Sequence, residues 1–365
     1  MIFPVIGVLL LAMAAYAAFH IKELLGLTPL SRNNRLTWIL GLVFSFGMFA
    51  LALGTRGAVI AWGFYTFLLW VVADALRVAF LLFAKVSALR QLYLRVYAKG
   101  ATAVILALLI CIGGYINAKT RHVSEYTVQI QTPSANAAPL TIALLTDIHL
   151  GDGLFEKDVE QIVQETNALA PDIVLLGGDI FVETSTPAQI DAALASFSNF
   201  QTTLGVYFVP GNHEYYADRS VFFLDALLPR LIDANIIPLR DDVLLIDNRF
   251  YLIGREEHSV PRAAIETLMQ GLDSCYPTIV LSHQPAGARQ AAAAGIDLYL
   301  SGHTHAGQLF PAGVLSDWFN INEFNHGLYH IGDFSVIVNA GTGTWGFPVR
   351  VGSACEIVLV HISSI

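Results

Sequence analysis

The sequence predicts a chain in two parts, a membrane-embedded region of four helices followed by an α/β layered domain. Hydrophobic residues make up 55% of the 365 residues and charged residues only 13%, whereas a soluble domain is about one quarter charged. Long uncharged runs fill the first 120 residues, and short apolar segments alternate with helical patterns after residue 140. These observations exclude a disordered chain, a collagen and a typical cytosolic enzyme.

The two parts carry opposite charge. Residues 1–120 hold ten Lys and Arg against two acids, and residues 121–365 hold ten against 27, which gives the net charge of −9. The acidic second part argues against nucleic acid as a partner, because phosphate backbones are bound by basic surfaces. It fits a site that binds cations. Three cysteines do not make a disulfide framework.

Four apolar runs in the first part are long enough to cross a bilayer, which takes about 20 helical residues. We expect helices over residues 2–19, 36–53, 58–84 and 101–118. The first run lacks the charged start and cleavage site of a secretory signal, so we favour an anchor. Asp74 and Arg77 share a helix face near the end of the third run. They form either an intramembrane ion or proton site or, as we favour, an interfacial pair.

Basic residues in the short loops predict the orientation of the chain. Loops 21–35 and 85–100 hold seven Lys and Arg, whereas loop 54–57 holds only Arg56. Basic loops stay in the cytoplasm, so we expect an outside N-terminus and, after four crossings, a second part outside the cytoplasm. Lys119 and Arg121 at the exit weaken this inference. The predicted location is a multi-pass position in the inner cell membrane, with the lipid bilayer as a partner.

The second part begins after a linker, residues 121–140, which is expected to contain one strand. From residue 141 to 365, strands and helices alternate in a way that is typical of an α/β layered domain. The predicted strands cover residues 140–146, 172–176, 205–209, 243–246, 249–253, 278–281, 298–301, 335–339 and 356–361. The predicted helices cover residues 156–170, 187–200, 221–235, 262–270 and 284–294.

Polar side chains directly follow five of these strands. Ligand sites in α/β sheets form beyond the carboxyl ends of strands, so the five segments are expected to meet. Imidazole and carboxylate groups together suit metals such as Mn, Fe or Zn. Each motif alone is weak evidence for a metal site, but five such motifs in order, each at the end of a strand, are not weak evidence. They are Asp147-Ile148-His149, Gly178-Asp179, Gly211-Asn212-His213-Glu214, His283 and Gly302-His303-Thr304-His305.

This ordered set resembles the motifs of the calcineurin-like metallophosphoesterases, over residues 140–365. The segments GHTHAGQLFP (302–311) and GTGTWGFPVR (341–350) are similar to a membrane-associated bacterial branch of that superfamily. That branch includes phosphodiesterases and enzymes related to those that cleave lipid-linked pyrophosphates. The resemblance implies a four-layer α/β/β/α sandwich with a dinuclear metal centre.

The resemblance also implies which side chains bind two divalent ions, most readily Mn, Fe or Zn and alternatively Mg. One ion would be held by Asp147, His149, Asp179 and His305. The other would be held by Asp179, Asn212, His283 and His303, so that Asp179 bridges the pair. Two ions about 3.5–4 Å apart can deprotonate a water near neutral pH and neutralise charge on the phosphoryl oxygens.

His213 would be the catalytic histidine that binds no metal and protonates or stabilises the leaving oxygen. Family members often carry an acidic residue three positions after the bridging aspartate to orient this histidine. Here that position is Val182, and Glu183 follows it, which leaves the orienting partner open. We interpret Glu214 as structural rather than catalytic.

The predicted function is a membrane-anchored phosphoesterase that acts on phosphodiester, pyrophosphate or phosphomonoester bonds. Its substrate would be a phosphate-containing small molecule or a lipid-linked or envelope phosphate. The alternative is a non-catalytic binding or scaffold module, although all seven ligand positions are filled. Segment 311–334, rich in Gly, Asn and aromatic residues, would be a substrate lid or membrane-dipping loop, or an ordinary packed excursion.

Overall fold

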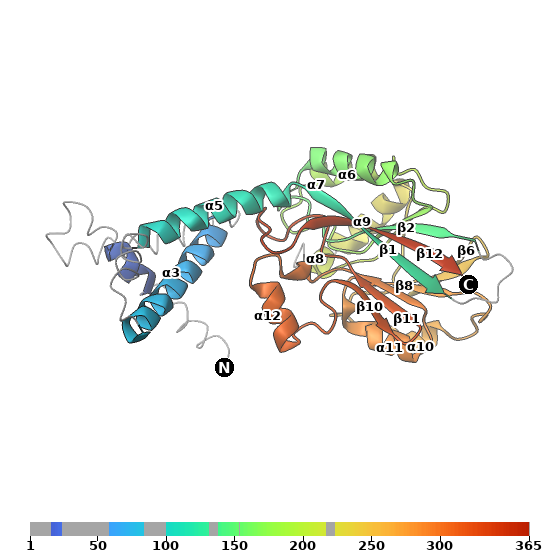
Figure 1. Cartoon of the computed structure of the whole chain (residues 1–365). Helices are drawn as coiled ribbons and strands as arrows, with labels where there is room; N and C mark the ends of the chain where they lie inside the picture. The colour runs from blue at the N-terminus through green and yellow to red at the C-terminus, as the bar shows by residue number, and fades with distance from the viewer. Residues whose placement is uncertain are drawn as a thin grey trace. The chain divides into compact units, whose positions relative to one another are not determined.

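The computed structural model describes residues 16–23, 58–83, 100–130, 138–152, 154–216 and 223–364. The chain divides into two compact units, Met1–Tyr115 and Ile116–Ile365. Each unit is described by itself, and Figure 1 shows the elements of both.

The first unit contains helices that match two of the predicted membrane runs. They are α3 (Ala58–Phe83) and α5 (Ala101–Ala118), and α5 ends just inside the second unit. Residues 16–23 are also helical, but residues 36–53 and most of 2–19 lie outside the described residues. Within the described residues, Ala101–Ala118 is the one helix long and apolar enough to cross a membrane. The four-helix region therefore stays a prediction.

Asp74 of α3 makes contacts within the first unit. Its carboxylate accepts a hydrogen bond from the Tyr16 hydroxyl at 2.8 Å and lies 3.2 Å from Nε2 of His20. The side chain of Arg77 lies outside the described residues, so the predicted pair with Asp74 stays a prediction.

The second unit is built on two sheets, each with six strands among the described residues. The first sheet has the order β1 (Arg121–Ile130), β12 (Cys355–Ser364), β2 (Leu140–Leu145), β3 (Ile173–Leu176), β4 (Val206–Phe208) and β5 (Ile236–Pro238). The second has the order β10 (Gly327–Ile331), β11 (Phe334–Val338), β9 (Leu298–Ser301), β8 (Thr278–Leu281), β7 (Phe250–Gly254) and β6 (Asp242–Ile246). Both sheets mix parallel and antiparallel pairs.

Alternation along the strands produces four layers. Ile142 and Leu144 of β2 pack between the two sheets, together with Ile279 of β8. Ala143 and Leu145 face the opposite way because successive strand residues point to opposite faces, and they pack against the helices of the first sheet. These helices are α6 (Glu156–Ala168), α7 (Pro187–Phe197) and α9 (Phe223–Asp233). The second sheet is covered by α10 (Ile265–Leu268) and α11 (Ala288–Ala293).

The directions of the strands bring the polar motifs to one end of the sandwich. Strands β2, β3 and β4 are parallel to one another, as are β7, β8, β9 and β11. Strand β1 starts at the same end, because Arg121 pairs with Cys355 at the start of β12, and β12 runs antiparallel to β2. The chain therefore enters the domain at the end where the carboxyl termini of β2 and β3 lie.

Every predicted strand of the second part is present, and five elements were not predicted. They are β5, β10, the helices α8 (Asn212–Tyr216) and α12 (Ala312–Phe319), and the helical turn η4 (His305–Gly307). The remaining helical turn is η3 (Pro285–Gly287). The helix expected over residues 262–270 is only α10, and residues 284–294 divide into η3 and α11. Segment 311–334 consists of α12, a turn and β10, the first strand of the β10–β11 hairpin, and its role as a lid, a membrane-dipping loop or a packed excursion stays a prediction.

Candidate metal centre

All seven predicted metal ligands lie in the segments that follow β2, β3, β4, β8 and β9, with Asn212 at the start of α8 and His305 at the start of η4. Five of them have left-handed backbone angles: Asp147 (φ 53°), His149 (φ 51°), Asp179 (φ 53°), His303 (φ 73°) and His305 (φ 51°). A residue other than glycine in such a conformation costs on the order of 1–3 kcal/mol and persists only where its surroundings hold it. This concentration of strained residues at one end of the sandwich is typical of a functional site.

One group of side chains surrounds Asp147. Its Oδ1 lies 3.4 Å from Nε2 of His305 and 3.8 Å from Nε2 of His149, and the two imidazole nitrogens are 3.1 Å apart. Nε2 of His149 is also 3.8 Å from Oδ2 of Asp179. The donor atoms of Asp147, His149 and His305 converge closely enough to hold one cation, and Asp179 approaches this group through His149.

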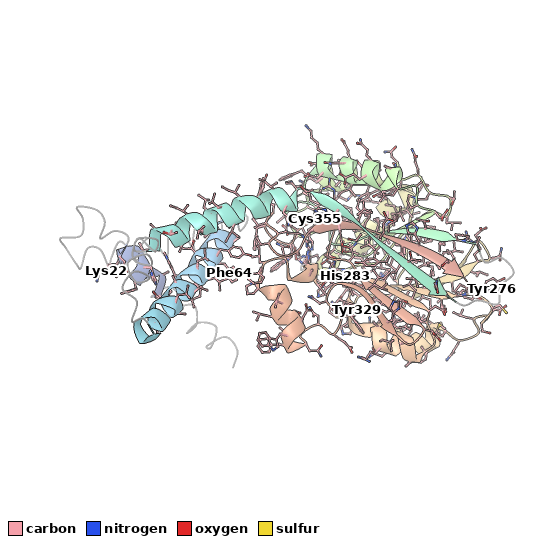
Figure 2. All side chains as sticks on the ribbon, in the orientation of Figure 1. Lys22, Phe64, Tyr276, His283, Tyr329 and Cys355 are labelled. Carbon is pink, nitrogen blue, oxygen red and sulfur yellow. The ribbon has the colours of Figure 1, made fainter. Side chains whose placement is uncertain are left out.

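A second group surrounds His283. Its Nε2 lies 3.2 Å from Oδ1 of Asn212, 3.1 Å from Nδ1 of His303 and 3.2 Å from Oδ2 of Asp179. The same carboxylate oxygen of Asp179 therefore faces both groups. Figure 2 places His283 toward one end of the domain and Tyr276, which precedes the same strand, toward the other. The structure brings the seven predicted ligands together, and their role as ligands stays a prediction.

The buried donors fit divalent cations. Oδ2 of Asp147 accepts a hydrogen bond from the backbone N–H of His303 at 2.9 Å, but Oδ1 has no hydrogen-bond partner among the described residues. A buried carboxylate oxygen without a partner is costly. Here it points at two imidazole nitrogens, and the mixture of carboxylate, imidazole and amide donors is one that Mn, Fe and Zn accept.

The acidic and histidine side chains of the site shift one another's pKa values. Burial alone would raise the pKa of the Asp147 carboxyl, but the neighbouring His305 and His149 hold that pKa well below its ordinary value. Burial likewise acts to raise the pKa of Asp179, and His283 outweighs it, so this pKa is also lowered. For His283, burial acts to lower the pKa, whereas Asp179 and Asp147 raise it to about 10. Because histidine binds metal as the neutral ring, a cation bound here would displace a proton from His283.

Two glycines let the loops approach the ligands. A Cβ atom at Gly211 would lie 2.2 Å from Oδ1 of Asp179, and one at Gly302 would lie 2.4 Å from Oδ2 of Asp147. Both distances are far shorter than a non-bonded contact allows. The two aspartates can therefore occupy these positions only because neighbouring residues have no side chain.

The comparisons with known proteins agree with this geometry. Residues 140–307 match the family model of the calcineurin-like phosphoesterases. The chain contains a calcineurin-like metallophosphoesterase domain.

Two curated relatives and one solved structure illustrate the similarity. A Bos taurus transmembrane protein with a metallophosphoesterase domain is 34% identical over 281 residues, which cover 70% of this chain and 61% of the relative. An uncharacterized metallophosphoesterase of Helicobacter pylori (strain J99) is 36% identical over 227 residues, 61% of this chain and 60% of the relative. The chain thus spans about three fifths of the length of these relatives. A dimetal phosphatase from Danio rerio aligns at a TM-score of 0.37 and 14% identity, over 55% of this chain and 87% of that one.

Glu214 organises the backbone of the metallophosphoesterase domain next to Asp179. Its fully buried carboxylate accepts hydrogen bonds from the backbone N–H groups of Asp179, Ile180, Phe181 and Gly211, at 2.7–3.0 Å. All the hydrogen bonds that the structure gives to this carboxylate come from backbone N–H groups. This agrees with the interpretation of Glu214 as a structural residue.

The acidic side chain that contacts His213 in the domain is Glu183. Nδ1 of His213 lies 3.0 Å from Oε2 of Glu183, whereas Val182 is a buried apolar residue. Burial acts to lower the pKa of His213, but Asp179 and the hydrogen-bonded Glu183 raise it. The expected acidic partner is therefore present one position later than in the family pattern.

Sequence reasoning assigned no role to Arg350, whose guanidinium is fully buried behind His305 in this domain. Nη1 donates to the His305 carbonyl at 3.1 Å, and Nη2 lies 3.2 Å from Nδ1 of His305. Nη2 also donates to the carbonyls of Ala340 and Gly343. Arg350 thus fixes one predicted ligand against the 340–343 loop. The signal in the sequence was a single charged residue at the end of the Gly-rich segment 341–350.

Proposed function

We propose that the chain is a membrane-anchored phosphoesterase that uses two divalent metal ions to hydrolyse phosphodiester, pyrophosphate or phosphomonoester bonds. The observation that carries this proposal is the position of Asp179, whose Oδ2 faces His149 on one side and His283 on the other. Bound there, two cations would supply the charge that activates water and stabilises a phosphoryl group under attack. All seven ligand positions are filled, which favours an enzyme over the alternative of a scaffold on the same fold.

Residues other than the predicted ligands would protonate the leaving oxygen or hold the ligands in position. His213 is held by Glu183 through Nδ1, which leaves Nε2 as the nitrogen that can give a proton to the leaving oxygen. The raised pKa of His213 favours the protonated ring that such a donor needs. Arg350 and Glu214 hold His305 and the loop of Asp179 in place and need no contact with substrate.

Removal and return of metal tests the enzymatic assignment. The purified full-length protein, stripped with a chelator, should hydrolyse neither bis-p-nitrophenyl phosphate nor p-nitrophenyl phosphate nor a lipid pyrophosphate. Addition of Mn²⁺, Zn²⁺ or Fe²⁺ should restore turnover on at least one of them. The bound metal measured in the same samples should approach two ions per chain. A protein that binds two ions and turns over no member of this panel would favour the scaffold alternative.

We also propose that the catalytic domain lies outside the cytoplasm of a bacterial cell. The support is the excess of Lys and Arg in loops 21–35 and 85–100 over loop 54–57. An exterior site would exclude cytosolic nucleotides and favour lipid-linked or envelope phosphates as substrates.

Protease added to intact spheroplasts is expected to digest the domain, because an exterior domain is accessible without lysis. A cytoplasmic protein followed in the same samples controls for leakage. Full protection of the domain until the cells are lysed would place the site in the cytoplasm. Cytosolic pyrophosphates would then become candidate substrates.

A further inference from the structure

Helix α12 and its neighbouring loops expose an apolar surface that the catalytic site does not use. We define the α12 patch as six side chains with exposed fractions of 50–79%: Phe310, Val314, Trp318, Phe319, Ile321 and Trp345. Trp318 and Phe319 stack at 6.2 Å between ring centroids. The Gln308 side-chain amide donates to the Trp345 carbonyl at 3.0 Å and so ties the loop of Trp345 to the segment before α12. This hydrogen bond therefore links two of the segments that carry the patch.

The packing of α12 differs from that of a helix that supports a core. Its sequence, Ala312–Phe319, is apolar except for Ser316 and Asp317, yet Ser316 is the only one of its eight residues that is buried. An aromatic side chain can bury roughly 150–250 Å², and here Trp318 and Phe319 are 79% and 69% exposed. Exposed apolar side chains concentrated on one element in this way are typical of a site of protein or membrane contact.

The patch lies beside the place where the chain enters the domain. Asn117, in the last turn of α5, belongs to the same compact unit and donates to the carbonyls of Arg350 at 3.1 Å and Ser353 at 2.7 Å. The backbone N–H of Phe310 in turn donates to the carbonyl of Val351 at 2.6 Å. Loop 350–353 thus joins the patch to the end of α5, which is the helix long enough to cross a membrane.

We propose that the α12 patch inserts into the interfacial layer of the lipid bilayer next to α5. This inference rests on the membrane anchoring proposed above. Trp and Phe side chains favour the level of the lipid headgroups, where an apolar ring meets water. Segment 310–321 holds one charged residue, Asp317, and no Lys or Arg, so its attachment is apolar and independent of anionic lipid.

Insertion of the patch would fix the distance of the metal centre from the bilayer. The predicted ligand His305 precedes Phe310 by five residues, and the ligand loops lie at the end of the sandwich where the chain enters from α5. A site held at that level would meet phosphate groups at the bilayer surface. The substrate class that fits is therefore a phosphate ester or pyrophosphate attached to a lipid.

Fluorescence of a polarity-sensitive label tests the insertion directly. The full-length protein with Cys275→Ser retains two buried cysteines, Cys111 and Cys355, and one cysteine is then added for NBD labelling. Trp318→Cys and Ile321→Cys report on the patch. Leu109→Cys, on an exposed position of α5, reports on the anchor. Asp333→Cys is the matched control, because it lies in the turn before β11, at the end of the sandwich opposite the ligand loops.

The labelled proteins are placed in phosphatidylcholine nanodiscs with and without nitroxide-labelled phosphatidylcholine. Labels at 318 and 321 should emit at shorter wavelength than the label at 333 and lose at least about half of their emission to the nitroxide lipid. The label at 333 should respond to aqueous iodide instead. Replacing part of the phosphatidylcholine by phosphatidylglycerol should leave these results unchanged, because the patch carries no basic residue.

The responses of the labels to the two quenchers distinguish failure of the inserted patch from failure of the membrane anchor. Labels at 318 and 321 that respond only to iodide overturn the inserted patch, even when the label at 109 is quenched by lipid and the anchor stands. The inserted patch is also overturned if the labels at 318 and 321 are shielded from both quenchers and this shielding grows with protein concentration. A second copy of the chain would then cover the patch. Absence of lipid quenching at 109 contradicts the anchor alone, and the hydrolysis assay decides the catalytic proposal independently of all three labels.

Discussion

Replacing Asp179 with asparagine is expected to abolish turnover and to release at least one metal ion. The carboxylate faces both groups of donors through Oδ2, at 3.2 Å from His283 and 3.8 Å from His149. Its Oδ1 meanwhile accepts a hydrogen bond from the backbone N–H of His213 at 2.8 Å. Asparagine keeps the shape of the side chain but removes the negative charge that would hold two cations. The loss of one preorganised electrostatic group costs about 10²–10³ in kcat, so a group shared by two ions should cost at least that much.

The measurement pairs hydrolysis rates with the metal content of the purified variant. Asp172→Asn is a matched control, because Asp172 directly precedes β3 while Asp179 follows it, and its carboxylate accepts from the backbone N–H of Thr141. This control should keep both ions and near-normal turnover. An Asp179→Asn protein with two ions and near-normal rates would show that the centre is not dinuclear in the way proposed.

Replacing His213 with alanine is expected to lower kcat by roughly 10²–10⁴, the usual worth of a positioned proton donor, without loss of metal. The structure also supplies the competing outcome, because His213 forms a third group of converging donors with His149 and Asp179. If His213 were a ligand, the alanine variant would lose an ion. The hydrogen bond between its Nδ1 and Glu183 favours the proton-donor role.

Metal content and pre-steady-state rates distinguish the two roles of His213. His258→Ala serves as the matched control, since His258 is an exposed histidine outside the converging groups. We expect the control to keep its metal and its rate. A substrate with a leaving group of low pKa needs little protonation and should recover much of the rate lost in His213→Ala. Equal losses for good and poor leaving groups would contradict a role as proton donor.

The ligand loops could be predicted because their signals are local. Each strand is a short apolar run, and its polar residues follow at once, as in Leu140–Leu145 before Asp147 and His149. The parallel arrangement of β/α units then brings the strand ends together without further information. The elements that the sequence did not reveal are those whose pattern is weak. Strand β5 has only three residues and ends in Pro238, and β10 has no buried residue to mark an inner face.

Other features depend on contacts between residues far apart in the chain. The pairing of Glu183 with His213 requires knowledge of how the loop after β3 turns, and the family pattern pointed to Val182 instead. Arg350 reaches His305 across 45 positions, which no local pattern encodes. For segment 311–334 the sequence left a lid or membrane-dipping loop and a packed excursion as alternatives, because an apolar segment such as the eight residues of α12 fits a core helix as well as a surface one.

The close approach of Gly211 and Gly302 to the two aspartates has a consequence for how this protein tolerates variation. Neither glycine has a side chain that could bind a cation, yet even alanine at either position would collide with a carboxylate oxygen. Intolerance to substitution and participation in chemistry are therefore separate properties here. A map of tolerated residues would show these positions as restricted as the aspartates themselves, and only their geometry would reveal that the restriction is steric.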